Sequence, residues 1–482
     1  MRIFPKFFWN LICLLIVGLV KTNGCEITGS HQRISTKQGN FTSFLQTNDY
    51  FGQAVTHADV DGDGTPELIV SAPYDDEESL TNFNIGALYV LFVNENAMVQ
   101  SFQKINQVSG GLTMTQSKPN FFYVLNDFYD VHDDGMVEIL IGYGVDDSDS
   151  YDRGAVYIMS LTSTGMVHSF TKISSDPADS NMTMTLDNSD YFGSSVSRGG
   201  DIDGNGFEDI LVGAINDDGG GTDAGAVYLI YLDGDAAPIS HTKVSRSRSW
   251  FTADLGTYDY FGYAVAGLGD INHDGNQDFV ATARDHDEVH YNVGAVYVIF
   301  LRQFERYVKS HQKISATSGG LTAELEYECR FGSSIQPLGD MNYDGTPDIL
   351  VGADLMDEAG GNTGAVFILF LDDSGLCVSH QKISREVGPF VSALGSFIYL
   401  GYRSAMSVVG DINGDSIDDW LFGFYNFAES EYTGTGGALV LFGTGGKPFL
   451  FLSVRLLIEL DCMRYMCVYL DVCFFVVCHS CV

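Results

Sequence analysis

The sequence predicts an all-β fold assembled from one repeated unit. An acidic stretch recurs along the chain, short runs of β-branched and aromatic residues recur in phase with it, and no useful helical period interrupts them. The recurring stretches begin at Asp59, Asp130, Asp201, Asp270, Asp340 and Asp411, which gives steps of 71, 71, 69, 70 and 71 residues. A spacing this regular indicates one structural unit repeated six times.

Three further signals recur around each acidic stretch. A Phe-Gly pair precedes most of them, as at Phe51, and a Gly-Ala pair opens an apolar run after them, as in GALYVLF from Gly86. A segment of the form HQKIS then follows, as at His311. The Phe-Gly segment, the run after the acidic stretch, the Gly-Ala run and the HQKIS segment are predicted to be four short strands.

A four-stranded sheet with two apolar faces cannot bury both of them alone, so neighbouring units must supply the core. The sequence therefore predicts a β-propeller of six four-stranded blades, with seven as the alternative. The last unit lacks an HQKIS segment after GALVLFG from Gly437, whereas a spare copy, HQRIS, occupies residues 31–35 before the first unit. We expect this N-terminal strand to complete the last blade and to close the ring.

The acidic stretch DVDGDGTPELIV, residues 59–70, has the residue types of a calcium loop. Calcium binds six to eight oxygen ligands, and positions 1, 3, 5 and 9 supply them here, with a turn-forming glycine at position 6. It is not an EF-hand, because position 12 is Val70 and the closing acid is Glu67. The predicted ligands are Asp59, Asp61, Asp63, Glu67, Asp130, Asp134, Glu138, Asp201, Asp203, Asn205, Asp209, Asp270, Asn272, Asp274, Asp278, Asp340, Asn342, Asp344, Asp348, Asp411, Asn413, Asp415 and Asp419.

Two loops depart from this pattern. The second has His132 at position 3, which is a poor calcium ligand, and the sixth has Ser416 in place of the glycine. Turns favour Asp, Asn and Gly without any metal, so metal-free hairpins are the alternative interpretation. Acids at positions 1, 3, 5 and 9 number four in the first loop and three in each of the other five, 19 in all, and such repulsion calls for a cation. We expect about four to six Ca²⁺ ions, with dissociation constants of about 0.1–1 mM.

Net charge excludes one class of partner. The chain has 25 Lys and Arg against 63 Asp and Glu, a net charge of −38, which excludes nucleic acid and disfavours anionic membrane surfaces. Paired acids such as Asp75-Asp76, Asp146-Asp147 and Asp217-Asp218 recur in phase and are interpreted as loop solvation. No catalytic motif is recognised, so we expect no enzyme.

Both termini differ from the repeats. Residues 1–24 have a basic start and a short apolar core, as a secretory signal peptide does, and sequons at Asn40 and Asn181 fit an extracellular glycoprotein. Residues 447–482 hold five of the nine cysteines, and the open interpretations are a sequence artefact, a membrane anchor or a helix on the ring. The repeats contain few cysteines, among them Cys329 and Cys377. Whether these two form a disulfide stays open.

The Phe-Gly pair, the DxDGDG loop and the Gly-Ala pair resemble the FG-GAP repeat of the integrin α-chain head. The resemblance covers residues 25 to about 446. It implies a propeller that holds calcium in hairpin loops on one rim and meets ligands on the other face. That family's ring usually has seven blades, and its repeat is shorter than this one, which is closer to the FG-GAP arrays of secreted microbial and protist proteins.

Together these observations predict a secreted or cell-surface calcium-binding propeller. It would act as an adhesion module for an extracellular protein or glycan, with membrane association left open. The alternatives are an extracellular structural coat protein and an enzyme scaffold. An enzyme would need residues that break the repeat symmetry in one blade.

Overall fold

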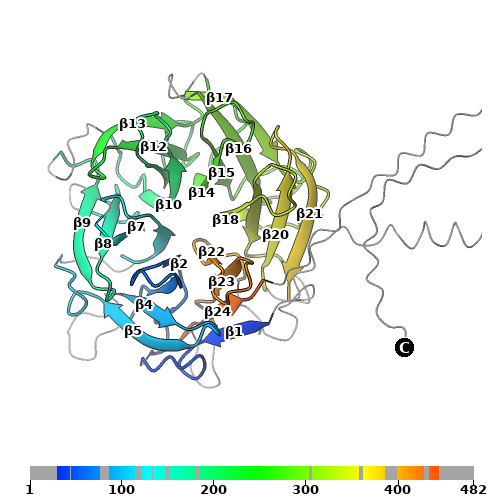
Figure 1. The fold of residues 1–482 in the computed structure, drawn as a ribbon. Coiled ribbons are helices and arrows are strands. Elements are labelled where there is room, and N and C mark those ends of the chain that lie inside the picture. Colours follow the sequence, from blue (N-terminus) through cyan, green and yellow to red (C-terminus); the bar gives the residue numbers. More distant parts are fainter. Residues whose placement is uncertain are drawn as a thin grey trace, which may run out of the picture. The chain divides into compact units, whose positions relative to one another are not determined.

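The computed structural model describes residues 30–443, except 44, 76–85, 114–120, 133, 148–150, 178, 180–183, 249, 303–306, 358–361, 386–398 and 428–433. The expected signal peptide, the cysteine-rich tail and the sequon at Asn181 lie outside the described residues. Within them the strands form six four-stranded antiparallel sheets arranged as blades around a central axis (Figure 1). No helix in this part of the chain is long and apolar enough to cross a membrane.

Each of the first five blades is built from four consecutive strands, the first of which lies nearest the axis (Figure 1). The first blade contains β2 (Val55–Ala58), β3 (Glu67–Ala72), β4 (Ala87–Val93) and β5 (Val99–Ile105). The second contains β6 (Val124–Asp127), β7 (Val137–Tyr143), β8 (Ala155–Leu161) and β9 (Val167–Ile173). The third contains β10 (Phe192–Gly200), β11 (Asp209–Ala214), β12 (Ala226–Leu232) and β13 (Pro238–Val244).

The remaining blades follow the same order until the ring closes. The fourth contains β14 (Phe261–Gly269), β15 (Asp278–Ala283), β16 (Ala295–Arg302) and β17 (Tyr307–Ile314). The fifth contains β18 (Phe331–Gly339), β19 (Asp348–Ala353), β20 (Ala365–Leu371) and β21 (Cys377–Ser384). The sixth contains β22 (Met406–Gly410), β23 (Asp419–Gly423), β24 (Ala438–Leu441) and the N-terminal strand β1 (His31–Ile34).

Strand β1 completes the sixth blade, as the spare HQRIS segment predicts. It pairs antiparallel with β24, from His31 opposite Leu441 to Ile34 opposite Ala438. Ile34 is fully buried in the cluster that the sixth blade shares with the first. The prediction of a ring closed by its N-terminal strand is confirmed, and the described strands form six blades.

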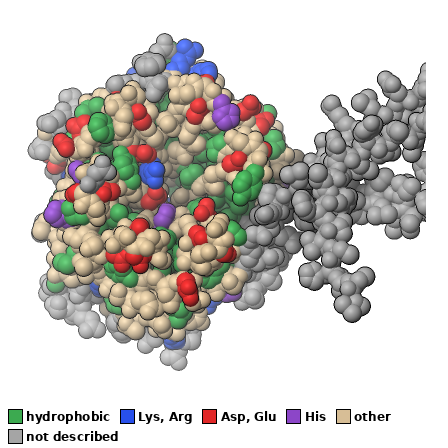
Figure 2. All heavy atoms as spheres, in the orientation of Figure 1, with side chains coloured by type: hydrophobic (Ala, Val, Ile, Leu, Met, Phe, Trp, Pro, Cys, Tyr) green, Lys and Arg blue, Asp and Glu red, His purple; other side chains and the backbone are tan. Residues whose placement is uncertain are grey.

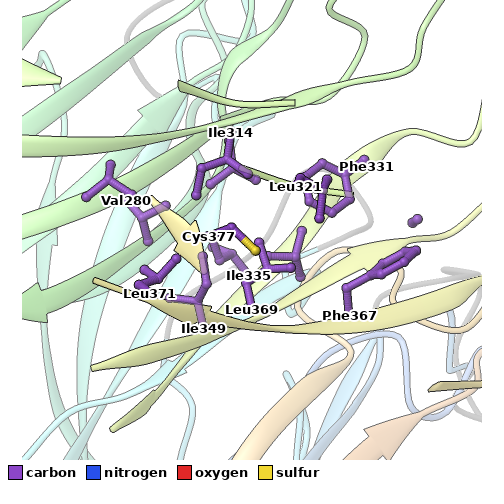
Figure 3. Packing of buried hydrophobic residues seen from close by; sticks show 14 of the residues in the cluster. Val280, Ile314, Leu321, Phe331, Ile335, Ile349, Phe367, Leu369, Leu371 and Cys377 are labelled. Carbon is purple, nitrogen blue, oxygen red and sulfur yellow. The ribbon is translucent and has the colours of Figure 1, made fainter. Parts of the chain in front are cut away.

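The hydrophobic core lies between the blades. In the cluster of Figure 3, Val280 and Ile314 of the fourth blade pack with Phe331, Ile349 and Leu369 of the fifth. The inner strands of a blade therefore need the neighbouring blade to bury one of their faces. The same cluster includes two buried free thiols, so no disulfide links Cys329 to Cys377.

The Phe-Gly and Gly-Ala pairs form the contact between adjacent blades. The N–H of Phe261 donates to the carbonyl of Ala224 at 2.9 Å, and Phe261 bridges Gly225 in parallel orientation. Gly225 has a φ of 84°, and a Cβ built there would lie against the carbonyl oxygen of Phe261, far inside van der Waals contact. Phe51 and Gly436 form the same bridge where the sixth blade meets the first. The glycine is thus required by both its backbone conformation and the close approach of the next blade.

Replacing Gly225 by Ala is expected to destabilise the fold by about 3 kcal/mol. The left-handed conformation costs an alanine about 1–2 kcal/mol, and forcing two blades apart costs about 1–3 kcal/mol. Gly269→Ala is the matched control, because Gly269 also has a positive φ, 73°, but nothing lies within 4 Å of a Cβ placed there. Urea unfolding of both variants measures the difference. Equal losses would show that the close contact between blades adds nothing.

The first acids of the paired-acid segments do not solvate loops, so that prediction is wrong for Asp75, Asp146 and Asp217. Asp75 is buried, where it accepts hydrogen bonds from Tyr89 Oη and Lys104 Nζ, both at 2.6 Å. Equivalent Tyr–Asp–Lys groups recur in the second and third blades. The tyrosine and the lysine come from the third and fourth strands of the blade, which is why the local sequence around the aspartate does not reveal them.

Candidate metal sites

All six acidic loops lie at the same end of the blades. Each connects the innermost strand of a blade to the second strand, as the loop from β2 to β3 does. Acidic side chains accordingly gather over several blades on the face shown in Figure 2. The repeat thus places one acidic hairpin on each blade of a single rim.

Position 1 of each loop shapes the turn. In the first loop, Asp59 Oδ2 accepts the N–H of Gly64 at 3.1 Å, and the carboxylate at position 1 accepts the N–H at position 6 in the other five loops as well. Ser416 takes this place in the sixth loop with a φ of 68° and donates at 2.6 Å to Asp411. Loss of the glycine therefore leaves the sixth turn intact.

The side chain at position 5 stabilises the turn of its own loop. In all six loops its side-chain oxygen accepts the N–H at position 7, as Asp63 Oδ1 does from Thr65 at 2.7 Å. In the third loop Asn205 also donates its amide to the carbonyl of Leu232. In the fourth loop Asp274 pairs with Lys309 at 2.6 Å. These side chains hold the turn together, and in the part of the chain that the structure describes none of them belongs to a group of three acids within 4.8 Å.

Position 9 connects the loop to the blade. Asp209 is fully buried, and its two oxygens accept the N–H groups of Ile202 at 2.8 Å and of Leu232 at 2.9 Å. The first contact lies inside the loop, and the second lies at the end of β12. Glu67 makes the corresponding loop contact with Val60 at 2.7 Å. An ion bound beside this carboxylate would therefore be coupled to the strands.

Burial raises the pKa of the acids at position 9. Removal from water lifts the pKa of Glu67 and Asp209 to about 7, although their backbone hydrogen bonds act in the opposite direction. The pKa values of Asp278 and Asp348 also rise to about 7, and that of Asp419 to about 6, for the same reason. These carboxylates are costly to ionise unless a positive charge lies nearby.

Two loops bring three acidic side chains together. Asp59, Asp61 and Glu67 in the first loop each offer an oxygen within 4.8 Å of the others, and Asp201, Asp203 and Asp209 do so in the third. Positions 1, 3 and 9 therefore converge. Oxygen donors of this kind fit a hard divalent cation such as Ca²⁺.

Position 3 distinguishes these two loops from the rest of the described ones. It is an acid in the first and third loops, His132 in the second, and asparagine in the last three. In the second loop His132 Nδ1 lies 3.4 Å from Glu138 Oε1. In the fourth loop Asn272 turns its amide nitrogen, not its oxygen, toward Asp278 at 3.0 Å. A group of three carboxylates therefore needs an acid at position 3. The remaining predicted ligands in these four loops, Asp130, Asp134, Asp270, Asp340, Asn342, Asp344, Asn413 and Asp415, occupy the same turn positions without such a group.

The calcium-free protein is expected to lose stability as the pH rises. Asp209 and Asp348 have pKa values of about 7 when folded, against 3.8 for ordinary aspartate, so their contribution to stability is present below about pH 4 and is lost as the pH rises through about 7. Dialysed protein should melt several degrees lower at about pH 8 than at about pH 5. Added Ca²⁺ should raise the melting temperature more at about pH 8, because protons and calcium compete for the same oxygens. An equal calcium effect at both pH values would contradict this coupling.

Comparisons with known proteins agree with this architecture. The FG-GAP repeat family matches residues 51–91, 192–230 and 261–299, which lie in the first, third and fourth blades. Integrin alpha-PS5 of Drosophila melanogaster is 33% identical over 172 residues, 34% of this chain and 15% of that protein. Integrin alpha-5 of Xenopus laevis is 35% identical over 172 residues, again 34% of this chain and 15% of that protein.

The fold and the acidic rim define a β-propeller repeat protein. More specifically, the chain contains FG-GAP repeats in its first, third and fourth blades and resembles integrin α-chains. The match spans about 15% of the length of these integrin chains. The repeat also occurs in an enzyme, because phosphatidylinositol-glycan-specific phospholipase D of Bos taurus is 28% identical over 192 residues, 39% of this chain and 21% of that protein.

Proposed function

We propose that this chain is a secreted or cell-surface propeller that binds calcium in its hairpin loops and acts as an adhesion or ligand-binding module. The observation that carries the proposal is the convergence of three carboxylates in the first and third loops, each including a buried acid at position 9. The resemblance to integrin α-chains favours binding of an extracellular partner. The strongly negative net charge of −38 argues against nucleic acid.

Calcium would be held by Asp59, Asp61 and Glu67 in the first loop and by the equivalent acids in the third. Its charge would offset the desolvation of the acid at position 9, and its bonds would join the loop to the strands. The other four loops offer fewer converging acids, so we propose weaker sites there and about four to six ions in all. Calcium thereby stabilises the rim rather than taking part in a reaction.

We propose binding rather than catalysis. The innermost strands of the first and sixth blades, β2 and β22, form a serine–histidine contact. In it His57 Nδ1 lies 3.1 Å from Ser407 Oγ. Within the described residues His57 hydrogen-bonds Ser407 alone, so a carboxylate that would orient the ring is missing from this pair. Burial also lowers the pKa of His57. A structural coat protein and an enzyme scaffold remain the competing functions, and the repeat in the phospholipase D keeps the second one relevant.

Calcium-dependent binding of an extracellular partner tests the proposal. The purified chain, immobilised through its C-terminal side, is exposed to extracellular fluid and to intact cells of the source organism, with Ca²⁺ and with EGTA. Elemental analysis of the dialysed protein gives the number of ions. Retention of specific partners that EGTA releases supports a binding module. A chain that holds calcium but retains nothing points to the structural role.

A further inference from the structure

We propose that a pocket on the fourth blade binds a neutral oligosaccharide. This inference rests on the proposed function as a binding module and specifies its ligand. The pocket has a volume of about 390 Å³, in the range of small-molecule sites, roughly 300–1,000 Å³. Its walls include Tyr258, Tyr260, Asp285, Asp287, Tyr291 and Asn292.

The pocket lies at the opposite end of the blade from the acidic rim. Asp285, Asp287, Tyr291 and Asn292 belong to the connection from β15 to β16, and Tyr258 and Tyr260 precede β14. The acidic loop of this blade instead joins the far end of β14 to the start of β15. A ligand here would therefore not compete with calcium for the same side chains.

Tyrosine rings form the open walls. Tyr258 and Tyr291 are each 53% exposed, and Tyr327, which is 61% exposed, lies against Tyr291 with ring centroids 6.3 Å apart. The apolar C–H face of a pyranose ring is complementary to such a tyrosine ring, while the phenol hydroxyl remains available for hydrogen bonding.

The backbone holds these tyrosines in place before any ligand arrives. The N–H of Tyr258 donates to Thr222 O at 2.9 Å and that of Tyr260 to Asp223 O at 3.3 Å, both in the preceding blade. On the other side, Asp287 Oδ1 accepts the N–H of Asn292 at 2.8 Å. A wall that is already ordered loses little conformational entropy when a ligand binds.

The charge of the pocket favours a neutral ligand over a cationic one. Asp285 lies between two arginines, with the Nε atoms of Arg284 and Arg330 each 3.4 Å from its Oδ1. These guanidinium groups compensate Asp285 and thereby weaken the attraction of the pocket for a lysine or arginine side chain. An anionic ligand is disfavoured by the net charge of −38. Carboxylate and amide oxygens beside aromatic rings remain, which suit the hydroxyls of a neutral sugar.

Two of the lining residues, Tyr258 and Asp285, depart from the repeat. Tyr258 lies three residues before the phenylalanine of the Phe-Gly pair. The first, third and fifth blades have Asn48, Ser189 and Glu328 at this position. Asp285 occupies a position that is Asn216 in the third blade. Tyr260, Asp287 and Tyr291 have counterparts of the same type in other blades, such as Tyr191, Asp218 and Tyr151. The combination with Tyr258 and Asp285 is therefore what distinguishes the pocket of the fourth blade.

The test uses the full chain with Ca²⁺ bound and an array of neutral oligosaccharides of glucose, galactose, mannose and N-acetylglucosamine. Sialylated and sulfated glycans and a tetra-arginine peptide are included as charged probes. We expect neutral glycans to bind, with affinity falling at least about tenfold in Tyr258→Ala and in Tyr291→Ala. Tyr151→Ala should change affinity less than about twofold, because Tyr151 is 65% exposed at the equivalent position of the second blade, outside this pocket.

Thermal melting of each variant shows whether it is folded, and the exposed tyrosines should tolerate the change. Binding of tetra-arginine in place of neutral glycans, or glycan binding that survives both substitutions, would overturn the inference. The absence of any neutral-glycan binding would overturn it too. If calcium-dependent capture of a protein partner persists in that case, the proposed function stands and only its ligand is wrong.

Discussion

Removal of calcium is expected to lower the stability of the propeller by about 6 kcal/mol relative to protein in about 10 mM Ca²⁺. A ligand that binds only the folded state adds RT ln(1 + [L]/Kd), which is about 1.4 kcal/mol per site for a Kd of about 1 mM, and four sites give this total. This total already includes the counter-charge that the ion would supply to the buried carboxylates of Asp209, Asp278 and Asp348. Thermal melts with Ca²⁺, with Mg²⁺ and with EGTA measure it. A melt that does not respond to EGTA would exclude structural calcium.

Position 3 offers a matched pair of variants for the same experiment. Asp203→Asn in the third loop should weaken calcium binding about tenfold, because it removes one of three converging carboxylates. Asn272→Asp in the fourth loop should strengthen binding there by a comparable factor, because it supplies the acid that this loop lacks. Isothermal titration of dialysed protein separates the two. Equal and small effects in both variants would show that convergence of positions 1, 3 and 9 does not govern affinity.

Deletion of residues 31–35 is expected to cost about 4–6 kcal/mol and to open the ring. The deletion removes the pairing of β1 with β24 and the buried side chain of Ile34, whose loss alone costs about 2–5 kcal/mol. It also exposes the edge of β24, and an unpaired strand edge promotes association between copies. Thermal unfolding and size-exclusion chromatography measure the two consequences.

A point substitution controls for general damage to the N-terminal strand. Gln32 is half-buried, and its side-chain amide donates to the carbonyl of its neighbour Arg33 at 2.7 Å. Gln32→Ala should therefore change the unfolding free energy by less than about 0.5 kcal/mol. Ile34→Ala should lie between this variant and the deletion. An unchanged melting temperature after the deletion would mean that β1 does not close the ring.

The repeat made the architecture predictable. Four in-phase signals identify four strands per unit, and the spare HQRIS segment before the first unit predicts the pairing of β1 with β24. Both inferences depend on local residue types and on spacing, which a sequence displays directly. The requirement for glycine at Gly225 is different, because it arises from a carbonyl oxygen of the next blade, 36 residues further along the chain (Phe261).

Side-chain contacts between strands could not be predicted from residues that lie close together in the sequence. Asp75 looked like a solvated loop acid, yet Tyr89 and Lys104 from two later strands bury and neutralise it. A signal did exist, because the aspartate, the tyrosine and the lysine recur together in three blades. In the fifth blade Met356 and Phe367 replace the aspartate and the tyrosine together, while the lysine is retained as Lys382. Reading that covariation between repeats would have found the buried group.

The sequence by itself determined the four-stranded repeat, the manner of closure and the hairpin that carries the acids, because these follow from periodicity and from the alternation of strands and turns. The structure decided between six and seven blades and placed the acidic hairpins on one rim. Only the tertiary structure decided which acids converge. Positions 1, 3, 5 and 9 carry similar residue types in the sequence. In the structure, however, the side chain at position 5 accepts a backbone N–H of its own turn, and the side chain at position 9 is buried against the blade. The tyrosine pocket of the fourth blade also appeared only in three dimensions, since Tyr258 and Tyr291 come from different connections that the blade brings together.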